Sequence, residues 1–161
     1  MAHQLSPLSP GIVAPDFSLP RSSYAAVSLT DLRGRRVILV FFPTAFEPVS
    51  REQLMLYQEY LPQFEQLHGQ MLGISADYAW CHEAFGREAG ITFPLLADTP
   101  PSGRVSQLYG VYREFEHATA RALFVIDPSG IICFSTAYPE MVNPGVDGPL
   151  TVLESLRADV A

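Results

Sequence analysis

The stretch from Arg36 to Leu54 reads RVILVFFPTAFEPVSREQL, and the rest of the chain is organised around it. Its first half is a run of β-branched and aromatic residues that stops at Pro43, which is typical of a buried central strand. Within a few residues a helical pattern begins. The first turn of a helix has N–H groups without partners and carries the positive end of the dipole, so it favours an anion. Ser50 falls at this turn, and we expect the functional site there.

The helical pattern continues beyond this stretch to about residue 67. Its apolar residues recur at spacings of three and four, which predicts a helix that packs one face on a sheet. Pro62 interrupts the pattern and should kink the helix about one turn upstream. The apolar stripe consists of Leu54, Tyr57, Leu61, Phe64 and Leu67.

Further strands and helices are predicted on both sides of this unit. Upstream, residues 14–19 alternate like an edge strand, and residues 26–29 pair with them as a hairpin. Downstream, the turn sequence DPSG joins strands at 121–127 and 131–136 in a second hairpin. Helices alternating with strands indicate an α/β fold with a mixed central sheet covered by helices on both faces. The remaining predictions are strands at 71–75 and 93–98, and helices at 78–88, 105–109 and 150–160.

The size and composition suit one folded domain. The chain has 161 residues and a mass of 17.8 kDa, with 48% hydrophobic and 17% charged residues. Such a chain buries one sizeable core, so we expect a single domain over residues 1–161. Residues 1–13 are rich in proline and serine and are predicted to form an extended lead-in.

Charge and cysteine content exclude several classes of function. Ten basic against 17 acidic residues give a net charge of -7 without a basic cluster, so we expect no binding to nucleic acid or to a membrane. No signal-peptide pattern or membrane-spanning run occurs, which favours a cytoplasmic protein. Cys81 and Cys133 are far apart and outside any C-x-x-C pair, so no disulfide framework is indicated. No histidine spacing is typical of a metal site.

Four segments of the sequence resemble the peroxiredoxins, the alkyl hydroperoxide reductase and thiol-specific antioxidant family. They are APDFSL, FFPTAF, FPLLAD and ARALFVIDPSGII, in this order and spread over nearly the whole chain. The resemblance is nearest to the one-cysteine and bacterioferritin-comigratory-like branches. It implies a thioredoxin-like fold with an N-terminal hairpin, reduction of hydroperoxides by a thiol reductant, a homodimer formed through the active-site edge, and no cofactor.

The family's active-site pattern falls on Pro43, Glu47, Ser50 and Arg121. Pro43 and Arg121 match the pattern, whereas Glu47 replaces a Thr or Ser, and Ser50 replaces the cysteine that attacks the peroxide. A helix N-terminus and an arginine lower the pKa of a cysteine enough to form a thiolate, but a serine hydroxyl stays protonated and cannot form a sulfenic acid. A carboxylate at residue 47 would also oppose a thiolate. We therefore expect no peroxidase step through residue 50.

Three explanations of Ser50 compete. It is an engineered replacement of cysteine, a natural loss of that cysteine, or a new hydrolytic nucleophile. The additional change at Glu47 favours natural loss over engineering, and Ser50 lacks the flanking glycines of a nucleophile elbow. Without any chemistry, Ser50 would be a helix N-cap and Glu47 a favourable acid at the helix N-terminus.

Cys81 is the other candidate for thiol chemistry. It lies in AWCHEAF, beside the only tryptophan and His82, and would be the nucleophile if a thiol acts in this chain. A small apolar helix residue packed on the sheet has the same sequence pattern. The sequence thus leaves two functions open, a thiol peroxidase if the natural residue 50 is cysteine, or a redox-inert binding or interaction module.

Overall fold

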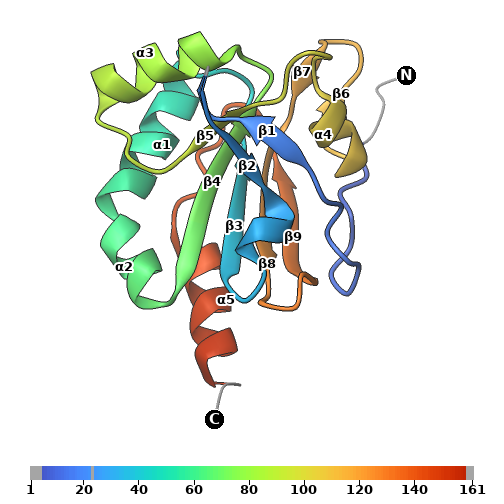
Figure 1. Cartoon of the computed structure of the whole chain (residues 1–161), viewed down its shortest axis with the longest axis vertical. Helices are drawn as coiled ribbons and strands as arrows, with labels where there is room; N and C mark the ends of the chain where they lie inside the picture. Colours follow the sequence, from blue (N-terminus) through green and yellow to red (C-terminus); the bar gives the residue numbers. More distant parts are fainter. Residues whose placement is uncertain (1–4, 23, 159–161) are drawn as a thin grey trace.

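A five-stranded mixed sheet forms the centre of the computed structural model, which describes residues 5–22 and 24–158 (Figure 1). The strand order is β5-β4-β3-β8-β9. Strands β3, β4 and β5 are parallel, and β8 and β9 are added as an antiparallel hairpin. This confirms the predicted α/β class and mixed sheet. The strands are β3 Arg36–Phe41, β4 Gly69–Ser75, β5 Leu95–Ala97, β8 Arg121–Ile126 and β9 Ile132–Tyr138.

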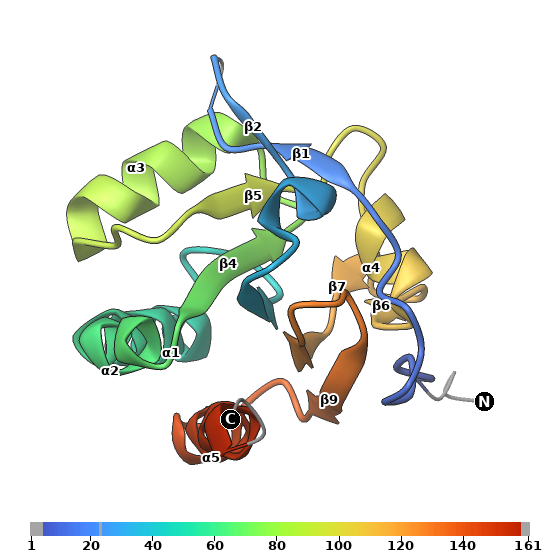
Figure 2. The same cartoon turned by 60° about the horizontal axis from the view of Figure 1, so that its bottom comes forward.

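Helices and hairpins cover the two faces of this sheet (Figure 2). Helices α1, α2 and α5 lie on one side, and the β1–β2 hairpin and α4 lie on the other, while α3 packs near the β5 edge. The helices are α1 Pro48–Glu59, α2 Leu61–Gln66, α3 Ala79–Ala89, α4 Arg104–Leu108 and α5 Asp147–Ala158, with a short 3-10 turn η1 at Leu29–Leu32. The short strands are β1 Ser18–Pro20, β2 Ala26–Ser28, β6 Tyr112–Arg113 and β7 Ala118–Thr119.

Strand β3 supplies both halves of the core because successive side chains of a strand point to opposite faces. Ile38 and Val40 are fully buried among the side chains of α1, α2 and α5. Leu39 and Phe41 are fully buried in the second cluster, which includes Tyr109 and the N-terminal hairpin. The strand therefore has to be apolar from Val37 to Phe41, as the opening stretch predicts.

The long helix predicted after β3 is divided into two. Helix α1 ends at Glu59 and α2 begins at Leu61, with Tyr60 between them. Pro62 lies in the first turn of α2, where its missing N–H interrupts no helical hydrogen bond. The disruption expected from the proline is confirmed as a break rather than a bend.

Several predicted boundaries differ from the structure. The strand expected at 14–19 is confined to β1, because Val13 forms an isolated bridge with Ile131 and Ala14 N donates to Gly130 O at 2.9 Å. Helix α5 begins at Asp147, three residues before its predicted start, and the predicted end at residue 160 lies outside the described residues. The small β6–β7 hairpin was not predicted.

The chain before β1 runs as an extended strap over α4. Ser6 N donates to Gly110 O at 3.2 Å and Leu8 N to Tyr109 O at 3.1 Å. The first four residues of the predicted lead-in fall outside the described residues. Among the described residues, none of the helices combines the length and the apolar character of a membrane span. The cytoplasmic location remains a prediction.

Candidate functional site

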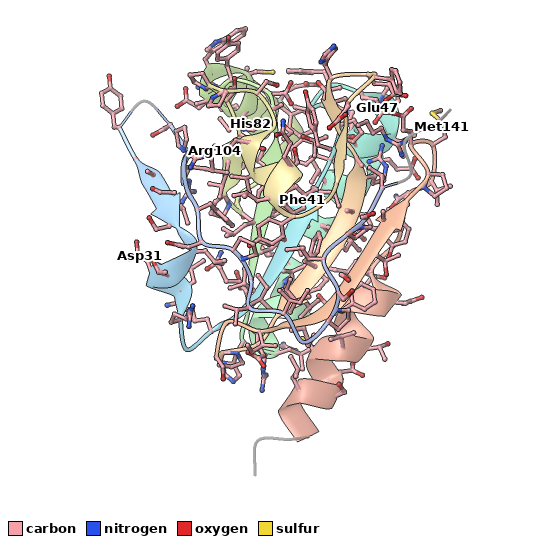
Figure 3. The ribbon with its side chains drawn as sticks, turned by 90° about the vertical axis from the view of Figure 1, so that its right-hand side faces the viewer. Asp31, Phe41, Glu47, His82, Arg104 and Met141 are labelled. Carbon is pink, nitrogen blue, oxygen red and sulfur yellow. The ribbon has the colours of Figure 1, made fainter. Side chains whose placement is uncertain are left out.

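The predicted site lies where β3 delivers the chain to α1, opposite the start of β8. Figure 3 shows Glu47 at the upper end of the molecule, away from the C-terminal helix. The loop that carries it leaves the sheet at Phe42 and turns through Pro43, which is half-buried. The sequence prediction of a strand, a turn and a helix N-terminus is therefore correct in this region.

Glu47 is the N-cap residue of α1, and its side chain folds back over the first turn. Oε1 accepts a hydrogen bond from Val49 N and Oε2 accepts one from Ser50 N, each at 2.8 Å. These N–H groups have no partner within the helix. Pro48 occupies the first helical position, where its fixed φ suits the helix. The helix N-terminus is thus already bound to a carboxylate of the chain itself.

Arg121 brings the remaining partners of this cluster together. Its side chain is fully buried, and Nη2 donates to Glu47 Oε2 at 2.9 Å. Nη1 donates to Gln53 Oε1 at 2.9 Å and to Ser50 Oγ at 3.2 Å. Nε and Nη2 also donate to the backbone carbonyl of Glu140, at 3.1 and 2.7 Å. The arginine predicted to face the helix N-terminus does so, and a carboxylate neutralises its charge.

Ser50 is fully buried between these two charged groups. Its Oγ lies 2.8 Å from Glu47 Oε2, so the single hydroxyl proton is donated to the carboxylate. Arg121 donates to the oxygen of the same hydroxyl. Ser50 is the third residue of α1, so the expectation that it is the N-cap is wrong. The helix begins at Pro48, and Glu47 takes that position.

The electrostatics of Glu47 favour its charged form. Partial burial acts to raise the pKa of its carboxyl group, but the hydrogen bonds from Val49 N, from both groups of Ser50 and from Arg121 outweigh burial and hold the pKa below its usual value. A carboxylate with a lowered pKa is a weak general base. Since Ser50 is also inaccessible to solvent, this geometry does not favour a hydrolytic nucleophile at Ser50.

Cys81 lies in a different environment, on α3. It is half-buried, and burial together with the negative charge of Asp77 raises the pKa of its thiol. An activated cysteine requires the opposite shift. The structure therefore brings Glu47, Ser50 and Arg121 together and leaves Cys81 outside their hydrogen-bond network.

A second polar cluster was missed by the sequence analysis. Ser75 ends β4 and is fully buried, and its Oγ lies 2.6 Å from Asp77 Oδ2 and 2.7 Å from His82 Nε2. Asp77 also accepts hydrogen bonds from Thr44 Oγ1 at 3.0 Å and Ala45 N at 2.9 Å. This cluster therefore fixes the loop before α1 to the start of α3. Its only sequence signal is an acid just after a buried strand, followed by a histidine early in a helix.

The direction of the hydrogen bonds in this second cluster can be assigned. Burial acts to raise the pKa of Asp77, but hydrogen bonds from His82, Ser75, Ala45 N and Thr44 together hold that pKa below its usual value. An ionised Asp77 only accepts, so the proton between it and Ser75 comes from the serine hydroxyl. His82 Nε2 must then carry the proton that it shares with Ser75 Oγ. In neutral His82, Nδ1 is therefore an acceptor.

The comparisons with known proteins agree with this fold and site. Residues 10–135 match the AhpC/TSA family. The chain belongs to this family. It is 41% identical over 139 residues to alkyl hydroperoxide reductase E of Mycobacterium tuberculosis. This alignment covers 86% of this chain and 88% of that protein. It is 32% identical over 157 residues to a thioredoxin peroxidase of Echinococcus granulosus, covering 91% and 80%.

Solved structures show that the AhpC/TSA fold extends over almost the whole chain. AhpC of Mycobacterium tuberculosis superposes with a TM-score of 0.84 at 24% identity, covering 96% of both chains. A 2-Cys peroxiredoxin of Plasmodium vivax gives a TM-score of 0.85 at 24% identity, covering 94% of this chain and 83% of the other. The predicted thioredoxin-like fold of the peroxiredoxins is therefore confirmed. Among the described residues, no group of three His, Cys, Asp or Glu side chains is placed to hold a metal ion.

Proposed function

We propose that this chain is a redox-inert member of the AhpC/TSA family, acting as a binding or interaction module, and that it does not reduce hydroperoxides through residue 50. The family reduces hydroperoxides, and its chemistry depends on a thiolate held at a helix N-terminus beside an arginine. The observation that carries the proposal is the carboxylate of Glu47, which bonds to the helix N-terminus, to Ser50 and to Arg121. It fills the place where negative charge would develop.

The same contacts explain why restoring a thiol alone would not restore the chemistry. A cysteine at residue 50 would place its sulfur next to the carboxylate that accepts the Ser50 proton at 2.8 Å. A negative charge so close opposes a second one and raises the pKa of the thiol. Arg121 could not compensate, because its Nη2 already donates to Glu47. Activation would therefore require the removal of Glu47 as well.

The fit between Ser50 and Glu47 supports natural loss of the cysteine over an engineered change. The serine hydroxyl donates to the carboxylate and accepts from Arg121, so each of the three side chains hydrogen-bonds to the other two. A single replacement made on a functional site would leave a Thr or Ser at residue 47 rather than this carboxylate. The two departures from the family pattern act as one unit.

The experiment compares thiol reactivity and peroxide consumption in matched variants. All variants carry Cys81→Ser and Cys133→Ser, so that residue 50 supplies the only thiol. We expect Ser50→Cys to show a thiol pKa above about 8.5, the ordinary value, and no turnover with hydrogen peroxide and dithiothreitol. We expect Ser50→Cys with Glu47→Thr to show a lowered pKa and measurable turnover. The pKa is read from the pH dependence of iodoacetamide alkylation.

Two results would contradict the proposal. Turnover by Ser50→Cys with Glu47 intact would show that the carboxylate does not prevent a thiol at residue 50 from reducing peroxide. Turnover by the unaltered chain that disappears in Cys81→Ser would make Cys81 the nucleophile and the chain a peroxidase of a different kind.

We also propose that the chain forms a homodimer through the edge that carries this site. Exposed apolar side chains lie on the segments that carry it: Phe46 precedes Glu47, and Met141 and Val142 follow Glu140, whose carbonyl accepts from Arg121. Figure 3 shows Met141 and Glu47 at the same end of the molecule. Such a patch next to a buried cluster suits an interface with a second copy. Light scattering during gel filtration should give a dimeric mass, reduced to a monomer by Met141→Glu. Tyr24→Glu, on the exposed β1–β2 turn, is the control, and a monomer for the unaltered chain would disprove the dimer.

A further inference from the structure

The segment that joins β9 to α5 is held by buried side chains near both of its ends. We call residues 139–146 the β9–α5 loop. Near its start, the carbonyl of Glu140 accepts two hydrogen bonds from Arg121, one from Nε at 3.1 Å and one from Nη2 at 2.7 Å. Near its end, the carbonyl of Gly145 accepts a hydrogen bond from the hydroxyl of Tyr57 at 2.8 Å. Both donor side chains are fully buried, so the loop is anchored to the core.

The guanidinium of Arg121 uses all of its donors in this arrangement. A guanidinium has five N–H groups, and Arg121 forms one hydrogen bond through Nε, two through Nη1 and two through Nη2. Three of these bonds go to Glu47, Ser50 and Gln53 on α1 and its N-cap, and two go to Glu140. Because the guanidinium is planar and rigid, the groups that fix it on the α1 side also fix where it holds the loop.

Glu47 is central to this connection because it supplies the charge. Among the described residues, it is the only acid that forms an ion pair with Arg121. The same nitrogen, Nη2, donates to Glu47 Oε2 at 2.9 Å and to the Glu140 carbonyl at 2.7 Å. A buried guanidinium that loses its counter-charge is costly, so the side chain then shifts toward water or other acceptors. We therefore expect the hold on Glu140 to weaken when residue 47 is neutral.

Between its two anchors, the β9–α5 loop exposes apolar side chains on a well-braced backbone. Met141 is 77% exposed and Val142 is 44% exposed. Internal hydrogen bonds run from Val142 N to Pro139 O at 3.1 Å and from Gly145 N to Asn143 Oδ1 at 3.0 Å. A surface that is already ordered loses less entropy when it binds a partner. The bracing thus suits the loop to act as an interface.

We propose that the Glu47–Arg121 pair holds the β9–α5 loop in the conformation that presents Met141 and Val142 to a second copy of the chain. Glu47 is then a positioning residue, which acts on the interface through Arg121 and the Glu140 carbonyl. The effect on dimerisation rests on the homodimer proposed above, whereas the effect on the loop does not. In this proposal, the cluster around Arg121 shapes an interaction surface.

The effect on the loop is measured by hydrogen exchange of the Val142 and Gly145 amides in NMR spectra. All chains in this experiment carry Met141→Glu, so that dimerisation does not protect the loop. We expect Glu47→Gln to raise both exchange rates about tenfold, because the charge-assisted bonds that hold Glu140 are weakened. If Glu47 served only as a helix cap, exchange would rise in the first turn of α1 alone, and this result would overturn the proposal.

Two control variants separate this effect from a general loss of stability. Glu52→Gln removes an exposed carboxylate from the same helix. Tyr109→Phe removes a buried hydroxyl that donates to Pro15 O at 2.6 Å in the other core cluster. We expect neither variant to change the exchange of the loop amides. An equal rise in Tyr109→Phe would overturn the proposal.

The effect on the interface is measured as the dimer Kd by sedimentation, in chains that keep Met141. We expect Glu47→Gln to weaken the dimer about tenfold and both controls to leave the Kd unchanged. Faster loop exchange with an unchanged Kd would overturn the link to the interface. A monomeric unaltered chain would disprove the homodimer and with it the role in assembly, while faster exchange in Glu47→Gln would still support the hold on the loop.

Discussion

Two polar clusters flank the loop between β3 and α1, and they differ in how their charges are paired. Around Arg121, the guanidinium and the carboxylate of Glu47 satisfy each other, and Ser50 bonds to both. Around Ser75, the hydroxyl joins Asp77 to His82, but one nitrogen of His82 has no partner in the described part of the chain. We call the first cluster closed because its two charges pair with each other, although Gln53 Nε2 has no partner among the described residues. The second cluster, with His82 Nδ1 unpartnered, is called open.

The difference concerns where each cluster places its charge. In the first cluster, the charge of Arg121 is neutralised from within the chain by Glu47. In the open cluster, the unpartnered Nδ1 of His82 is buried, and Ser75 rather than an ion pair joins the acid to the histidine. Each cluster thus has one buried nitrogen without a partner in the described part of the chain, and what distinguishes the first is its buried ion pair.

Among the variants of the closed cluster, Arg121→Met is expected to lower the free energy of unfolding most. It leaves the Glu47 carboxylate, the Gln53 amide and the Glu140 carbonyl without their shared donor, so we expect a loss of about 3–5 kcal/mol in the free energy of unfolding. Urea denaturation measures the change. Arg113→Met is the control, because Arg113 pairs with the half-exposed Glu140 carboxylate at 3.4 Å and should cost less than about 1 kcal/mol. Similar losses in both variants would show that the Arg121 cluster is not a closed structural unit.

A second comparison removes the central hydroxyl of each cluster. Ser75→Ala leaves His82 Nε2 and Asp77 without their common partner, and we expect it to cost about 1–3 kcal/mol. Ser50→Ala should cost about 1 kcal/mol at most, because Glu47 and Arg121 remain paired with each other. Both variants are measured by urea unfolding under the same conditions. A larger loss for Ser50→Ala would reverse the assignment of the closed and open clusters.

The smallest effect depends on pH and concerns the cap of α1. The pKa of Glu47 is lowered in the folded chain, so its charged form stabilises the fold above the unfolded value near 4.5, and this contribution is lost as the pH falls through the folded pKa. Glu47→Gln should cost about 1 kcal/mol at neutral pH, and the difference from the unaltered chain should shrink below about pH 4.5. Thermal unfolding across this pH range measures it. Glu52→Gln, exposed on the same helix, is the control, and a gap that stays constant with pH would contradict the charged cap.

Much of the fold could be predicted from local patterns in the sequence. The apolar run of β3, the stripe of α1 and α2, and the turn between β8 and β9 each carry their signal within about a dozen residues. Boundaries were less predictable where pairing is non-local. Residues 13 and 14 were expected in the first strand, but they bond to the turn at residues 130 and 131 instead.

The site was predicted in part, for a similar reason. Glu47, Ser50 and Arg121 were found from the resemblance to a family pattern, and the structure brings them together. Ser75, Asp77 and His82 were missed because a buried serine, a loop acid and a helical histidine are individually common. Only the packing of α3 against the end of β4 makes them one network.

The sequence by itself determined that residue 50 carries no thiol and that residue 47 carries a carboxyl group, because these are matters of side-chain chemistry. It also determined the strand, turn and helix that place both residues at a helix N-terminus. Only the tertiary structure decided that the Glu47 carboxylate, rather than a ligand, pairs with Arg121, since the two residues are far apart in the chain and meet across the sheet. Burial and distance, which no local pattern contains, decide this pairing.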